Sequence, residues 1–223
     1  LLKISDYRNK ELKEIVKIRK GESEPSLSHS TFFWRSEYYS HQRPDYFASV
    51  RMFSSRNHNM EVPYNSEGIK NHHLGNGSSF ISVTGKEYFN IFPVFDWQKI
   101  PGATIMQKNE LPPPDEVQKE GLTDFVGGVT NGHYGAAAFD FKSPYDPLEA
   151  KKSWFFFGNK YVCLGAGINC QSDHPVVTTV NQCLLKGDVT AMVCLSRFVL
   201  FGQPGIIRFG PYQPSARHRI DIS

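Results

Sequence analysis

Short runs of aromatic and β-branched residues, separated by Gly, Pro and Asn, fill the chain from Thr31 onward. This punctuation is typical of an all-β sandwich. In Ser78–Thr84 the pattern alternates, because Ile81 and Val83 share one face of the expected strand. We therefore predict a mainly β fold, an antiparallel β-sandwich. The predicted strands are Phe32–Trp34, Tyr46–Met52, Ser78–Thr84, Ile91–Phe95, Gly135–Phe141, Ser153–Phe157, Lys160–Leu164 and Val176–Gln182.

A different pattern precedes the β-rich part. Residues 6–20 carry apolar positions at helical spacing, and Gly21 is a typical stop for the predicted helix. The segment Glu22–Ser30 is rich in Ser, Glu and Pro and is predicted to be a linker. The residues expected to share one side of the helix are Leu12, Ile15, Val16 and Arg19.

Two segments between strands have clear turn or loop chemistry. Gly158-Asn159 lies between two runs of β-formers and predicts a two-residue hairpin in which Gly supplies a positive φ. Lys108–Glu120 contains three consecutive prolines, which cannot donate to a sheet, so we predict a surface loop.

Composition narrows the class of protein. The chain has 223 residues, of which 39% are hydrophobic and 13% aromatic, enough for a sizeable core. The net charge of +3 is too small, and the basic residues too scattered, to favour a nucleic-acid partner. No apolar run approaches the length that spans a bilayer, so we expect no membrane partner. The start at Leu1 has neither Met nor a signal-peptide pattern, and we interpret it as the interior of a longer chain.

The cysteines and histidines do not indicate a metal or a cofactor. Cys163, Cys170, Cys183 and Cys194 fit no zinc spacing, and we expect buried small side chains, with one disulfide left open. No metal ligand set stands out, and we predict no cofactor.

Four short motifs follow one another within about sixty residues. They are Ser54-Ser55-Arg56, Asn65-Ser66-Glu67, Gly75-Asn76-Gly77 and Asp96-Trp97 with Ile100-Pro101-Gly102-Ala103-Thr104. In this order they resemble the central β-domain of polysaccharide lyase family 8, the family of chondroitin AC and ABC lyases, hyaluronate lyase and xanthan lyase. Later segments, such as Ala150–Phe155 and Thr178–Val180, agree with it.

The resemblance implies a domain division. Residues 1–30 would be the end of an α/α toroid domain and a linker, residues 31–190 an incomplete central super-sandwich, and residues 191–223 a divergent or truncated end. It also implies β-elimination on an acidic glycan, for which the carboxylate of a uronic acid has to be neutralised. The family takes its Asn, His and Tyr for neutralisation and proton transfer mainly from the α/α domain.

The resemblance maps the catalytic role of a β-domain arginine onto Arg56, whose alternative is a surface residue at a strand end. Arg51 is the second candidate, for substrate binding. Because it lies five residues earlier, an extended strand would direct the two side chains to opposite faces. The acidic partner expected for the arginine is left open among Glu67, Asp140 and Glu149.

The remaining candidates for substrate binding lie in loops. His72 and His73 are either exposed polar residues or contacts for a sugar, and Asn65 either binds substrate or shapes its loop. Gly68 departs from the family's final Asn in this motif. Asn131 and His133 either reach the glycan or form a turn. Trp34, Trp97 and Trp154 are candidates for stacking on sugars or for the core.

The sequence therefore predicts a fragment of a secreted or periplasmic lyase whose partners are an acidic polysaccharide and the missing α/α domain of the same chain. We expect little or no activity from the isolated chain, because it lacks the His/Tyr pair. Two alternatives stay open: a non-catalytic carbohydrate-binding or structural β-sandwich, and a lyase of another β-sandwich family that uses His72 or His133 itself.

Overall fold

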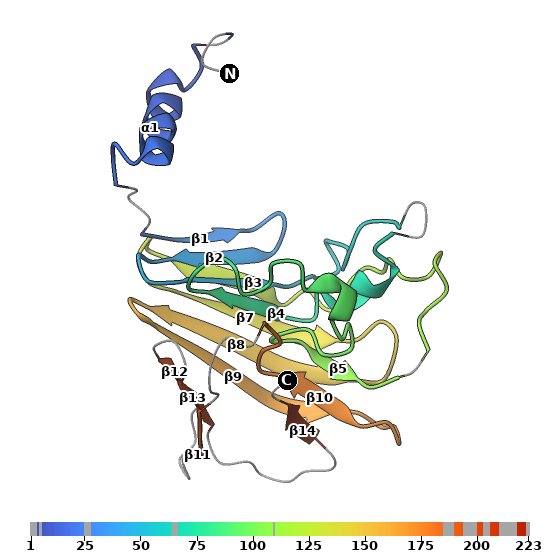
Figure 1. Cartoon of the computed structure of the whole chain (residues 1–223). Helices are drawn as coiled ribbons and strands as arrows, with labels where there is room; N and C mark the ends of the chain where they lie inside the picture. Colours follow the sequence, from blue (N-terminus) through green and yellow to red (C-terminus); the bar gives the residue numbers. More distant parts are fainter. Residues whose placement is uncertain are drawn as a thin grey trace.

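A computed structural model describes residues 4, 6–24, 28–63, 67–108 and 110–184, and beyond them the backbone of four further strand segments. The protein is mainly β, with one N-terminal helix and mainly antiparallel sheets stacked on one another (Figure 1). The predicted fold class is therefore confirmed.

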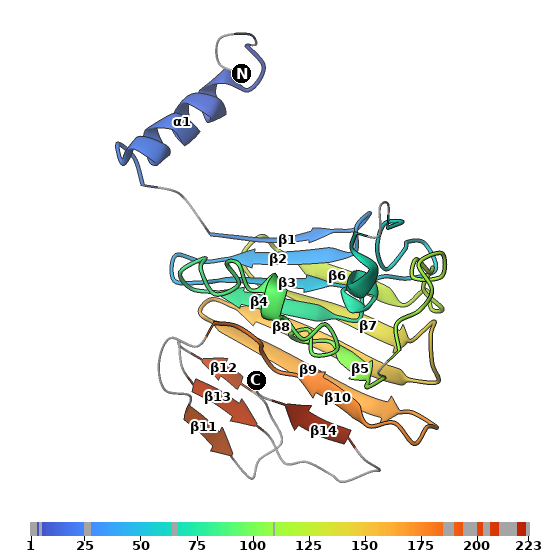
Figure 2. The same ribbon diagram turned by 45° about the vertical axis from the view of Figure 1, so that its right-hand side comes forward.

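Helix α1 (Asn9–Lys20) begins three residues later than predicted and ends at Gly21, as predicted. Gly21 has a φ of 73°, and its N–H donates to the carbonyl of Ile18. No residue of α1 is buried, and both Ile15 and Val16 are exposed. The helix lies apart from the sheets in both views (Figures 1 and 2).

The first sheet has four antiparallel strands in sequence order: β1 (His29–Phe33), β2 (Tyr38–Gln42), β3 (Phe47–Arg51) and β4 (Ser78–Ser82). Three of them match predicted strands with shifted ends. Strand β2 was not predicted; it pairs with β1 through a short turn at residues 34–37.

The second sheet has the strand order β11-β13-β12-β9-β8-β7-β6. The hairpin between β8 and β9 is the predicted one, since Phe157 pairs with Lys160 and Gly158 has a φ of 33°. A third sheet has the order β14-β10-β5. The bounds are β5 (Thr104–Met106), β6 (Val126–Thr130), β7 (Gly135–Lys142), β8 (Glu149–Phe157), β9 (Lys160–Asn169), β10 (Val176–Thr179), β11 (Thr190–Val193), β12 (Leu200–Gly202), β13 (Ile206–Phe209) and β14 (His218–Asp221).

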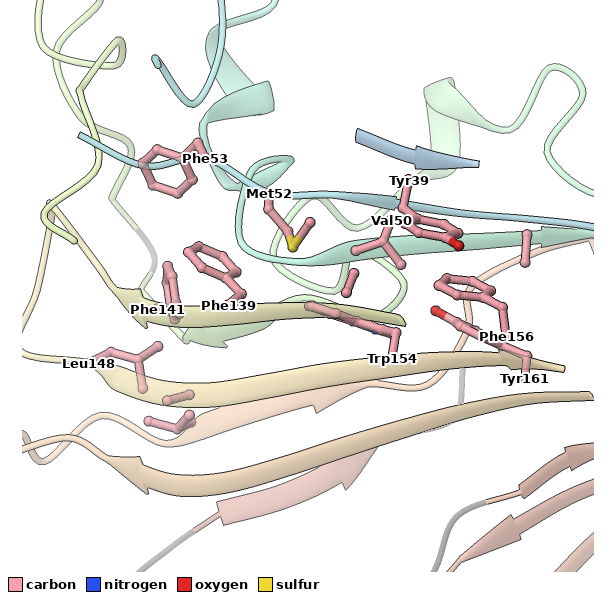
Figure 3. Packing of buried hydrophobic residues seen from close by; sticks show 14 of the residues in the cluster. Tyr39, Val50, Met52, Phe53, Phe139, Phe141, Leu148, Trp154, Phe156 and Tyr161 are labelled. Atoms are coloured by element: carbon pink, nitrogen blue, oxygen red, sulfur yellow. The ribbon is translucent and has the colours of Figure 1, made fainter. Parts of the chain in front are cut away.

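The main core fills the space between the first and second sheets (Figure 3). Aromatic rings meet across it: Tyr39 of β2 stacks on Phe156 of β8 with ring centroids 4.2 Å apart. Trp154, also on β8, is nearly fully buried. Apolar burial of this kind is the main stabilising contribution to a sandwich.

A second apolar cluster lies around residues 91–105. Ile91, Phe95, Ile100 and Ile105 are buried there, with Trp97 partly buried against them. The predicted strand Ile91–Phe95 is wrong, because this segment forms the 3₁₀ helix η3 (Phe92–Val94). Pro93 supplies the reason, since proline has no N–H for a ladder.

Two of the motifs that carry the family resemblance meet at one buried lysine. Lys152 on β8 donates through Nζ to the carbonyl of Asn76, 3.0 Å away, and to that of Gly102. Gly102 in turn donates its N–H to the carbonyl of Thr179. The Gly75–Gly77 and Pro101–Gly102 motifs therefore join the sheets of this fold.

The end of the chain contains strands that the sequence did not predict. The resemblance implied a divergent or truncated end over residues 191–223, where β13 and β14 form and pair with β11, β12 and β10. Cys194 lies outside the described residues. The predicted division at residues 30 and 190 stays a prediction.

Candidate functional site

The guanidinium of Arg56 lies in a turn just after β3 and bonds to two neighbouring segments. Its Nη2 lies 2.9 Å from Oε1 of Glu37, and its Nη1 donates to the carbonyl of Asp124 at 2.8 Å. A longer bond of 3.3 Å reaches the carbonyl of Val126. The side chain is 53% exposed, so the guanidinium is oriented yet open to solvent.

Glu37 is the acidic partner that the sequence left open, so the choice among Glu67, Asp140 and Glu149 is corrected. Its side chain is 2% exposed and also accepts a hydrogen bond from the hydroxyl of Ser54. The backbone of Glu37 has a φ of 50°, which the tight turn before β2 imposes. Because β2 was not predicted, nothing in the sequence analysis pointed to this turn.

Arg51 and Arg56 both bond to the turn before β2, so the expectation of opposite faces, which assumed an extended strand, does not hold. The strand ends at Arg51, and the chain turns before it reaches Arg56. The Arg51 guanidinium donates to the carbonyls of Ser36 and His58. Burial lowers the pKa of Arg51, while nearby Glu37 raises it. The two arginines thus fix the turn before β2 from two sides.

His72 and His73 lie in the 3₁₀ helix η2 (Ile69–His73), and both are buried, at 3% and 4% exposure. Burial lowers the pKa of each ring, and that of His73 lies well below its ordinary value. Nδ1 of His72 donates to the carbonyl of Ile69, and Nδ1 of His73 accepts from Asn76. Their burial corrects the alternative that the two histidines are exposed polar residues, and their role in binding a sugar stays a prediction.

Asn131 and His133 lie in the turn between β6 and β7, at the opposite end of β6 from the residues that Arg56 contacts. The side-chain oxygen of Asn131 accepts from the backbone N–H groups of His133 and Tyr134, at 2.9 and 2.8 Å. Arg56 contacts the start of β6, and five residues of strand span about 16 Å. The structure therefore does not bring this pair together with Arg56.

The other predicted residues are dispersed. Asn65 lies outside the described residues, and Glu67 is exposed. Trp154 belongs to the core, Trp97 is partly buried, and Trp34 is exposed on the turn before β2. Cys163, Cys170 and Cys183 are free thiols. All three are only partly buried, whereas we expected them to be buried.

The described residues contain no group of three or more His, Cys, Asp or Glu side chains that could hold a metal ion. Among the same residues, no helix is both long and apolar enough to cross a membrane.

The domain is a mainly antiparallel β-sandwich in which the Arg56–Glu37 pair joins the turn before β2 to the turn after β3. The model of the super-sandwich domain of polysaccharide lyase family 8 matches residues 28–196. The chain therefore belongs to polysaccharide lyase family 8.

Curated relatives agree with this assignment. The chain is 43% identical over 158 residues to chondroitinase-AC of Pedobacter heparinus, a match that covers 70% of the chain and 22% of that protein. It is 32% identical over 148 residues to hyaluronate lyase of Thermasporomyces composti, covering 64% and 18% respectively. The chain thus spans about a fifth of the length of these relatives.

Solved structures show the same fold. A structure of chondroitinase AC lyase, from work on enzyme–oligosaccharide complexes, superposes with a TM-score of 0.73 and 32% identity. That match covers 90% of this chain and 32% of the other. Chondroitin AC lyase of Streptomyces coelicolor, in complex with chondroitin sulphate, gives 0.66 and 31%, covering 76% and 24%.

Proposed function

We propose that this chain is part of a lyase that cleaves an acidic glycosaminoglycan by β-elimination. The observation that carries the proposal is the 43% identity with chondroitinase-AC of Pedobacter heparinus. The proposal includes a helical α/α domain in the same longer protein, and action outside the cytoplasm, in the periplasm or after secretion, where such polysaccharides occur.

The chemistry explains why an arginine is needed. Elimination removes the C5 proton of a uronic acid, which lies next to a carboxylate, and transfers a proton to the leaving O4. The negative carboxylate opposes formation of a carbanion, so a cation that neutralises it lowers the barrier. An arginine suits this task because its planar fork matches the two oxygens of a carboxylate.

Arg56 is the residue of this chain that we assign to that role. Glu37 and the carbonyls of Asp124 and Val126 orient its guanidinium without using all of its N–H donors. The exposed part of the group is then free to meet a carboxylate. Pre-oriented donors of this kind typically contribute about 10²- to 10³-fold to a rate.

The proton-transfer groups are expected from the helical domain. Purified residues 1–223 should therefore bind an acidic glycan without cleaving it. Ultraviolet absorbance of the unsaturated uronyl product measures cleavage directly. Robust turnover by this chain alone would contradict the assignment of the proton-transfer groups to another domain.

The role of Arg56 is tested in the longer protein with two substrates, a glycosaminoglycan oligosaccharide and its uronate methyl ester. Arg56→Gln should lower kcat/KM about 10²-fold on the carboxylate and much less on the neutral ester. Lys151→Gln, at an exposed position of β8, is the control for loss of a positive charge and should change neither value.

An equal loss on both substrates would mean that Arg56 supports the fold and does not face the carboxylate. Thermal unfolding of the Arg56→Gln protein separates these cases. Unchanged turnover on both substrates would favour the alternative, a super-sandwich that binds or supports without taking part in the reaction.

A further inference from the structure

The turn between β1 and β2 exposes an aromatic ring with a cation stacked on it. Trp34 is 69% exposed, the largest exposure among the three tryptophans that the described residues contain. The guanidinium carbon of Arg35 lies 5.0 Å from the centroid of the Trp34 ring. With so much of the residue exposed, the guanidinium covers one face of the indole and leaves the other to solvent.

The turn that presents this pair is held by hydrogen bonds from three directions. Arg51 donates to the carbonyl of Ser36, and the side-chain amide of Asn57 donates to the carbonyl of Arg35 at 3.2 Å. The N–H of Met52 donates to the carbonyl of Glu37 at 3.0 Å. A ligand that binds such a turn does not have to order it, which favours affinity.

We propose that Trp34 and Arg35 form a saccharide-binding subsite for an acidic sugar. The open face of the indole would stack on the C–H face of a pyranose ring, and Arg35 would meet a carboxylate or sulfate at the edge of that sugar. This subsite rests on the proposed function, because it would hold a unit of the same polysaccharide beside Arg56. The connection is short: Asn57, which bonds Arg35, follows Arg56 directly.

Charge around the turn favours an anionic ligand. Arg35, Arg51 and Arg56 surround it, and the acid among them, Glu37, is buried and paired. Of the nearby acids, Glu120 faces His58 at 3.8 Å, and Asp124 meets Arg56 through its carbonyl. An apolar partner would leave the Arg35 guanidinium without a counter-charge, whereas a uronate or sulfate supplies one.

The test measures binding of chondroitin sulfate oligosaccharides to residues 1–223 by calorimetry, with dextran of matched length as a neutral control. Trp34→Ala should weaken binding about fivefold to tenfold, and Trp34→Phe should keep most of the affinity. Arg35→Gln should weaken binding about threefold and reduce its salt dependence. Phe157→Ala removes another exposed aromatic side chain, in the β8–β9 turn, and should bind as the wild type does.

Tryptophan fluorescence gives an independent reading. Iodide should quench Trp34 in the free chain, and bound oligosaccharide should protect it, while buried Trp154 stays unaffected in both states. Wild-type affinity in Trp34→Ala would overturn the subsite and leave the proposed function standing. Equal binding of dextran would overturn its acidic specificity. If the wild-type chain bound no acidic glycan, the subsite would fail, and the activity of the longer protein would decide the proposed function separately.

Discussion

Arg56 and Glu37 are paired at 2.9 Å although they lie 19 residues apart in the sequence. The carboxylate is buried at the start of β2, whereas the guanidinium is half exposed after β3. The buried carboxylate of Glu37 therefore fixes the orientation of the exposed guanidinium of Arg56. The hydroxyl of Ser54, the first residue of the Ser-Ser-Arg motif, bonds the same carboxylate oxygen.

Glu37→Gln should lower the free energy of unfolding by about 1–2 kcal/mol. The change leaves an amide against the donors of Arg56 and Ser54, and hydrogen bonds to a charged partner contribute about that much. Urea denaturation of residues 1–223 measures it. Glu22→Gln is the matched control, since Glu22 pairs with Lys20 only at the surface, 3.8 Å apart, and should cost less than about 0.5 kcal/mol. Equal midpoints for the two variants would contradict a stabilising role for the buried pair.

Gly102→Ala should destabilise the domain far more than Gly132→Ala. Both glycines have positive φ, at 76° and 86°, so the backbone strain of about 1 kcal/mol is shared. A Cβ on Gly102 would lie 2.5 Å from Cβ of Ser79 and 2.7 Å from its backbone nitrogen, whereas on Gly132 it meets nothing within 4 Å. We expect an extra loss of about 2 kcal/mol or more for Gly102→Ala, seen as a lower thermal midpoint. Similar midpoints would mean that the Pro101–Gly102 turn moves away from β4 at little cost.

Local chemistry in the sequence was sufficient to predict the β class, the Gly158 hairpin and the end of α1 at Gly21. These features depend on alternation and on the backbone freedom of glycine, both of which are local. The strand Ile91–Phe95 was wrong because its aromatic residues pack in a second cluster around a proline turn. Segment β2 was missed because Tyr38–Gln42 carries Ser, His and Gln, and its burial comes from pairing with β1 and β3.

The candidate site was predictable only in part. The Ser-Ser-Arg motif pointed to Arg56, but its partner Glu37 depends on how β1 and β2 turn, a long-range property of the sheet. The same holds for His72 and His73, whose burial comes from packing against Tyr145, a residue far along the chain. A histidine pair in a polar loop gives no local signal of this.

Acid should destabilise the domain through His72 and His73. Burial lowers the pKa of both rings below the ordinary value of 6.5, with Lys108 opposing and Asp146 favouring the charge on His72. The unfolded chain therefore binds more protons below about pH 6.5, and stability falls as the pH decreases from there. Urea midpoints at pH 5, 6 and 7 measure the effect, at most about 1.4 kcal/mol per pH unit for each ring.

The double change His72→Asn and His73→Asn should flatten this pH dependence, even if it lowers stability at pH 7. The control His174→Asn removes an exposed ring in the segment before β10 and should keep the wild-type slope. His41 remains in both proteins. Burial lowers the pKa of that ring to about 4, so it contributes the same part to each slope. Identical slopes in the double variant and the control would show that the two buried rings do not titrate with folding.

Lys152 should make the domain more stable as the pH rises from about 7 to 9. Burial lowers the pKa of its amine from 10.5 to about 7, so in this range the unfolded chain carries a proton that the folded chain has lost. Stability rises with pH wherever the unfolded state binds more protons, here by at most about 1.4 kcal/mol per pH unit. The window ends near pH 9, because burial raises the pKa of the Cys163 thiol to about 12 and gives the opposite slope above it. Lys152→Met should abolish the rise between pH 7 and 9, while Lys151→Met, at the exposed neighbouring position of β8, should preserve it. A rise that persists in Lys152→Met would assign it to another group and leave Lys152 charged in the folded protein.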